Sequence, residues 1–161
     1  MTRAYASWVE PVAERTSAVR MEFVEVARSI PAGDWDKSSP VAGWTYKDLL
    51  AHLAGDTGKN FLSILRAVVA RERVDGSLLG SPDDRNARDL EERRGRSVEE
   101  LIAEIEADTE EHLDLVSRLS ETDKDLRQDD IPTSLGEGLT NDPGGHVRRH
   151  LAQLRTALEA S

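Results

Sequence analysis

The 161-residue chain contains no cysteine. Disulfides, thiolate metal ligands and a cysteine nucleophile are therefore excluded, and any thiol chemistry must use an external thiol. Long apolar runs are also lacking, because residues 61–70 cover about half of the roughly 20 positions of a membrane-spanning helix and include Ser63 and Arg66. Residues 1–12 lack the basic start and apolar stretch of a signal peptide. We therefore expect a cytoplasmic protein with no membrane partner.

The chain has no excess of positive charge. Its formal net charge of -10 would repel phosphate backbones, and its basic residues are mixed with acidic ones, as in residues 85–96. Nucleic acid is therefore not an expected partner, whereas a small-molecule substrate is, and a homodimer is left open. The chain has no internal repeat and fits one domain of ordinary size, so we expect residues 1–161 to form a single domain.

Apolar residues recur mostly three, four or seven positions apart, which is typical of amphipathic helices. This spacing predicts four helices over residues 5–30, 46–73, 97–119 and 143–160, and a short helical piece near 88–94 within a surface loop. No alternating strand pattern competes with them. The predicted fold is all-α, a four-helix bundle with long inter-helix connections.

Three predicted helix starts carry capping signals. Thr45 with Asp48 and Ser97 with Glu100 match the capping-box spacing, and Asp142 before Pro143 is a favourable start for the last helix. Within the second helix, Gly55 and Gly58 indicate a kink or the close approach of another backbone.

Two of the four histidines, His146 and His150, are spaced four apart on the last predicted helix, so both imidazoles project from one face. His52 lies early in the second predicted helix among leucines, where an unpaired imidazole would be costly to bury. If the two helices are neighbours, the three side chains can bind a metal and leave a coordination position open. On spacing alone, a solvated or core-satisfied histidine pair is the alternative.

Several other residues are candidates for the same site. Asp56 follows His52 by four residues and could orient its imidazole or reach the metal pocket, whereas Asp48, four residues before it, is better explained as a cap. His112 has acidic neighbours and is expected on a solvated face, with a position lining the bundle as the alternative. Trp35 and Trp44 flank the first long loop and are expected to close the end of the core.

Arg148 and Arg149 directly follow His146. One of them, for which we take Arg149, could bind a carboxylate of the substrate or of a thiol cofactor. A salt bridge to a neighbouring helix is the favoured interpretation on the sequence alone.

Two segments carry a resemblance to a known family. Asp34-Trp35 with residues 43–55 (GWTYKDLLAHLAG), and residues 145–151 (GHVRRHL), resemble the DinB-like family, in the branch related to the N-terminal domain of mycothiol-dependent maleylpyruvate isomerase. Asn86 also resembles that branch, and the similarity spans nearly the whole chain. The resemblance implies a four-helix bundle of DinB-like topology in which His52, His146 and His150 bind Zn, Ni or a similar divalent ion.

The resemblance also implies a choice between chemistries. We expect a metal-dependent enzyme that acts on a small electrophile by S-transfer or isomerisation, with mycothiol, bacillithiol or another small thiol as cofactor. The alternatives are a metal-dependent hydrolase with Asp56 as general base, and a bundle that binds metal or ligand without catalysis. Since these 161 residues lack the additional C-terminal domain of the maleylpyruvate isomerases, we do not expect that exact reaction.

Overall fold

The computed structural model describes residues 3–57, 61–74, 81–128 and 131–160. Over these residues it is all-helical and contains no strand, so the predicted all-α class is confirmed. The helices are α1 (Glu10–Ser29), α2 (Tyr46–Gly55), α3 (Phe61–Ala70), α4 (Pro82–Arg93), α5 (Val98–Ser117), α6 (Leu135–Thr140) and α7 (Gly145–Glu159), with 3-10 turns η1 (Ala32–Asp34) and η4 (Glu121–Asp125). None of the helices in the described ranges is both long and apolar enough to cross a membrane.

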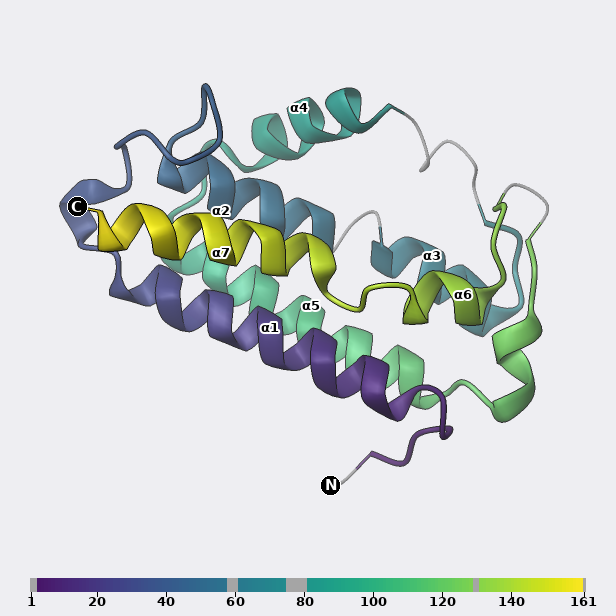
Figure 1. Ribbon diagram of the computed structural model, residues 1–161. Helices are drawn as coiled ribbons and strands as arrows, with labels where there is room; N and C mark the ends of the chain where they lie inside the picture. The colour runs from purple at the N-terminus through teal and green to yellow at the C-terminus, as the bar shows by residue number, and fades with distance from the viewer. Residues whose placement is uncertain (1–2, 58–60, 75–80, 129–130, 161) are drawn as a thin grey trace.

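The longest helices, α1 and α5, pack against each other. The helix α7 packs on α1, α2 packs on α5, and these four helices run alongside one another (Figure 1). The helix α4 packs against α2, and α3 packs against α5. Through this arrangement α2 and α7, which carry the predicted metal ligands, come to the same region of the molecule.

The apolar interior consists of two clusters. One joins α1, α2, α5 and α7 around Phe23 and Leu50, and the other joins α3, α6 and the ends of α1 and α5 around Leu65. Between the clusters, the inward face of α1 carries Thr16 and Arg20, and that of α5 carries Thr109 and His112, all buried. Buried polar groups cost free energy unless they are hydrogen-bonded, and Arg20 and His112 have buried nitrogens without a partner among the described residues, so these two side chains call for a functional explanation.

The continuous second helix predicted over residues 46–73 is wrong, because α2 ends at Gly55 and α3 begins at Phe61. A Cβ at Gly55 would lie 2.5 Å from Cγ of Asp89 on α4. The close approach expected at Gly55 therefore exists, but it is made by a side chain and not by another backbone. Gly58 lies outside the described residues.

Two helices were underestimated from the sequence. The helix α4 begins at Pro82, well before the piece predicted near 88–94, because Ser81 accepts a hydrogen bond from the backbone N–H of Asp84. The helix α6 was not predicted, although Ser134 and Glu137 form a capping box at its start. Both starts carry recognisable capping chemistry in the sequence, so these helices were predictable.

The start of the last helix differs from the prediction. Asp142 and Pro143 precede the helix, and α7 begins at Gly145 after Gly144, whose φ of 68° is left-handed. A Cβ at Gly144 would lie 2.4 Å from Cγ1 of Val19, so only glycine lets the turn pass this close to α1. The first helix likewise starts at Glu10 and not at residue 5.

Candidate metal centre and adjoining pocket

A capping box sets the start of α2 and thereby the position of His52. The backbone N–H of Asp48 donates to Oγ1 of Thr45 (3.1 Å), and the backbone N–H of Thr45 donates to Oδ2 of Asp48 (2.9 Å). The capping role expected for Asp48 is thus confirmed. One turn further along, the side chain of His52 is 3% exposed.

The structure brings the three predicted ligands together. His146 lies in the first turn of α7 and His150 one turn later, both facing His52 on α2. Their candidate ligand atoms all lie within 4.8 Å of one another. The four-residue spacing places His146 and His150 on one face of α7, and the packing of α2 beside α7 brings His52 to the same cluster.

The contacts and the burial of the clustered imidazoles suit metal binding. Nε2 of His52 and Nε2 of His146 lie 2.8 Å apart, a contact that accommodates a proton on only one of them. Nδ1 of His150 donates to Oε1 of Gln153 (3.0 Å), which leaves Nε2 of that ring with its lone pair. Burial, reinforced by His146 and His150, lowers the pKa of His52 to about 3. Burial is also the main cause that lowers the pKa of His150.

Trp44 belongs to this site and was not recognised in the sequence as part of it. Its ring packs on that of His52 with a centroid separation of 4.9 Å. Trp35, in contrast, is buried in the first apolar cluster, as expected of a residue that closes the core. The signal in the sequence was the position of Trp44 directly before Thr45, the N-cap of the helix that carries His52.

Asp56 caps the C-terminal end of α2 and lies beside the histidines. Its Oδ2 is 3.9 Å from Nε2 of His146, and both side chains are 38% exposed. The position four residues after His52 places it on the same side of α2. A carboxylate at this distance can orient His146 or accept a proton from a group bound beside it.

Arg149 lies outside the pocket. It is exposed, and its Nη1 lies 3.5 Å from Oδ2 of Asp142, while Arg148 donates to Oδ1 of the same carboxylate (2.7 Å) and to the carbonyl of Pro143 (2.8 Å). The salt bridges are thus made to the turn that precedes their own helix and not to a neighbouring helix. A contact between Arg149 and a cofactor stays a prediction.

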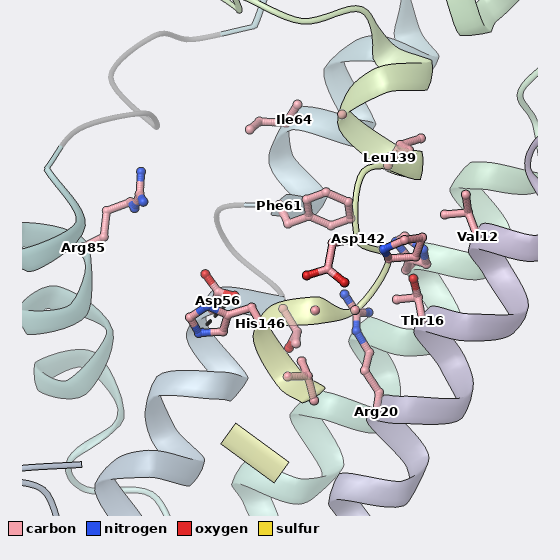
Figure 2. A pocket seen from close by; sticks show the side chains of 17 residues that line it. Val12, Thr16, Arg20, Asp56, Phe61, Ile64, Arg85, Leu139, Asp142 and His146 are labelled. Atoms are coloured by element: carbon pink, nitrogen blue, oxygen red, sulfur yellow. Dashed lines mark ion pairs between the residues drawn. The ribbon is translucent and has the colours of Figure 1, made fainter. Parts of the chain in front are cut away.

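A cavity of about 290 Å³ adjoins the histidine cluster. Asp56 and His146 lie on one side of it, and Val12, Thr16 and Arg20 of α1 lie on the other (Figure 2). Three residues of the polar layer between the two apolar clusters, Thr16, Arg20 and His112, therefore line this pocket.

His112 is buried, so its expected place on a solvated face is wrong. Its side chain is 1% exposed, lines the pocket and stacks on Phe61 with a centroid separation of 5.4 Å. Burial, reinforced by the charge of Arg20, lowers the pKa of His112 to about 3. His112 lies seven residues after Ile105 and four before Val116, a spacing that places it on the buried face of α5. The acidic residues next to it in the sequence had instead indicated a solvated position.

Arg20 is a further pocket residue that sequence reasoning missed. Its side chain is 4% exposed, and burial lowers its pKa to about 10, so it stays protonated at neutral pH. It lies four residues from both Thr16 and Val24 on the buried face of α1. A charged residue on an apolar helical stripe was the signal that could have found it.

A comparison with family models identifies a match to the mycothiol maleylpyruvate isomerase N-terminal domain over residues 16–154. The matched region contains the three clustered histidines, Asp56, Arg20 and His112. No curated protein and no solved structure matches the chain.

Proposed function

The chain belongs to the mycothiol maleylpyruvate isomerase N-terminal domain family, which has the DinB-like fold, and from that premise we propose that it is a divalent-metal-dependent enzyme. It uses a low-molecular-weight thiol, such as mycothiol or bacillithiol, in S-transfer to a small electrophile or in its isomerisation. The observation that carries this proposal is the convergence of three imidazoles beside a cavity in a chain without cysteine.

The residues of the cluster fit a divalent ion. His52, His146 and His150 would hold it, and imidazole nitrogens are good ligands for both Zn and Ni. Three protein ligands, without a fourth histidine or carboxylate in the cluster of the described residues, are typical of an open catalytic site. A divalent ion bound there would act as a Lewis acid that lowers the pKa of a thiol or water.

Asp56 and Arg149 complete the proposed machinery. Oδ2 of Asp56, 3.9 Å from Nε2 of His146, accepts the proton released by the thiol S–H. Arg149, one residue before His150 and exposed, contacts the part of the thiol that extends outside the cavity. Trp44 packs on His52 and holds its ring in place.

We extend the proposal to the whole chain. The helices α1, α2, α5 and α7 form the four-helix bundle of DinB-like topology, and residues 1–161 act as one domain in the cytoplasm. The partner is a small molecule, and neither nucleic acid nor a membrane.

The test uses purified protein loaded with Zn or Ni and assayed with mycothiol, bacillithiol and glutathione against a chloronitroarene and an α,β-unsaturated ketone. We expect turnover that requires both thiol and metal and disappears in the His52→Ala variant. Neither turnover nor thiol binding with any member of the panel would contradict the proposal.

A second candidate function is hydrolysis, which the position of Asp56 favours. Its carboxylate lies 3.9 Å from Nε2 of His146, where it could accept a proton from a water molecule bound beside the two side chains. In that case activity on reactive esters or amides persists without any thiol. A tightly held ligand with no turnover under either condition would instead identify a binding protein without catalysis.

A further inference from the structure

The chemistry proposed above leaves Arg20 without a role. Its side chain is buried in the wall of the pocket, and its Nε and Nη1 atoms have no hydrogen-bond partner among the described residues. Figure 2 shows this side chain extending from α1 toward the pocket. Burial of a charged group with unused donors is costly, so a role in binding would account for it.

The acidic groups nearest to Arg20 do not satisfy it. Asp108 and Asp56 favour its charged form from a distance, but no described carboxylate lies within ion-pair distance of the guanidinium. Asp142, on the same pocket, is already engaged by Arg148 and Arg149. The Nε and Nη1 donors of Arg20 thus remain available to a ligand inside the pocket.

His112 offers a second unused donor on the same wall. Both of its ring nitrogens are buried without a hydrogen-bond partner in the part of the chain that the structure describes. Burial keeps its ring neutral, so one nitrogen carries a proton that it can donate. The apolar side chains of Val12, Ile64 and Leu139 line the pocket around these polar groups.

We propose that Arg20 and His112 form a carboxylate-binding subsite in this pocket. The guanidinium binds the negatively charged group, the His112 N–H donates a second hydrogen bond, and the apolar wall contacts the carbon part of the ligand. The same cavity extends to His146 and Asp56, so the rest of the ligand faces the candidate metal centre. The ligand is therefore a small carboxylate with an apolar carbon part, and only its role as a substrate rests on the proposed function.

The test compares crotonate with crotonamide, which have the same number of heavy atoms and nearly the same shape but differ in charge. Binding to metal-free protein is measured at pH 7.5 by calorimetry and ligand-observed NMR. We expect crotonate to bind at least tenfold more tightly than crotonamide. Replacing Arg20 by Met should weaken crotonate binding by roughly 10- to 100-fold, the loss expected for a hydrogen-bonded charge pair.

The control variants separate binding from folding. Arg148→Met removes an exposed arginine that is already paired, and it should leave crotonate affinity unchanged. In Arg20→Met Asp108→Asn both the buried cation and its attracting carboxyl group are neutralised, so this variant should fold even if Arg20→Met alone does not. We expect both Arg20 variants to lose the increase in melting temperature that crotonate produces in the wild type.

Equal crotonate affinity in the wild type and the folded double variant would overturn the subsite. So would tighter binding of inorganic phosphate than of crotonate, or crotonate binding that appears only after metal is added. Because the comparison of the wild type with the Arg20 variants uses neither metal nor thiol, its failure leaves the proposed function intact. A failure of the thiol assay likewise leaves the subsite intact.

Discussion

Nε2 of His52 and Nε2 of His146 lie 2.8 Å apart, although 94 residues separate them in the chain. This contact joins α2 to α7 at the edge of the pocket, and His150 adds a third ring within the same cluster. Burial of His52 opposes its protonation, so its ring is held as a neutral imidazole. Neutral, converging imidazoles are the form in which histidine binds divalent metals.

Removal of one clustered histidine should abolish metal retention. We expect elemental analysis of the purified wild type to find about one Zn or Ni per chain, and of His52→Ala to find almost none, because two histidines remain. The matched control is His112→Phe, which removes a buried histidine outside the cluster and should keep its metal. Equal, negligible metal in the wild type and His52→Ala would refute the metal site.

Substitution of Asp56 by Asn should slow catalysis without loss of metal. A general base contributes about 10²- to 10⁴-fold, so we expect kcat to fall within this range while the metal content stays unchanged. Steady-state kinetics and elemental analysis of the same preparation check both expectations. Asp36→Asn, at an exposed loop position, should match the wild type, whereas an unchanged kcat in Asp56→Asn would remove the proposed role.

His112 should make the folded state less stable in mild acid. Its pKa is about 3 when folded but near 6.5 when unfolded, so below pH 6.5 the unfolded chain binds a proton that the folded chain rejects. The free energy of unfolding therefore decreases as the pH is lowered, and His112 contributes roughly 2 kcal/mol of this decrease between pH 6.5 and 5. Urea unfolding of the wild type and of His112→Phe at pH 7.5 and 5 measures the difference.

Asp108 acts in the opposite direction and must be separated from this effect. Burial raises its pKa to about 6, so its contribution favours the folded state as the pH falls through that value. Asp108 is present in both proteins, and the difference between the two unfolding curves isolates His112. If the stability difference is the same at both pH values, His112 is not buried in its neutral form.

Alanine at Gly144 should destabilise the fold more than alanine at Gly43. Both positions have positive φ, but a Cβ at Gly144 would meet Cγ1 of Val19, whereas a Cβ at Gly43 meets nothing within 4 Å. We expect Gly43→Ala to cost about 1 kcal/mol from backbone strain, and Gly144→Ala about 2–4 kcal/mol because overpacking adds to the strain. Chemical denaturation measures both, and equal losses would show that the turn does not pack tightly on α1.

Local sequence signals accounted for much of the helical structure. The capping box of Thr45 and Asp48 marked the start of α2, and that of Ser97 and Glu100 marked the start of α5. These signals act over a few residues, so they can be read without the tertiary structure. The start of α7 was misjudged because it depends on the contact of Gly144 with Val19, which lies on another helix.

The burial of charged and titratable side chains was harder to predict. Acidic neighbours made His112 look solvated, yet its side chain faces the interior between α5 and Phe61. Arg20 was overlooked because arginine is rarely buried, although its spacing placed it on the apolar stripe. Both errors arose from weighing residue type above helical position.

By itself, the sequence determined the absence of an internal thiol, the all-α class, the starts of α2 and α5 and the alignment of His146 with His150. These properties depend on composition and on contacts within one or two helical turns. Only the tertiary structure decided that His52 lies against His146, and that Arg20 and His112 share a pocket with Asp56. Those relationships depend on how distant helices pack, which no local pattern in the chain specifies.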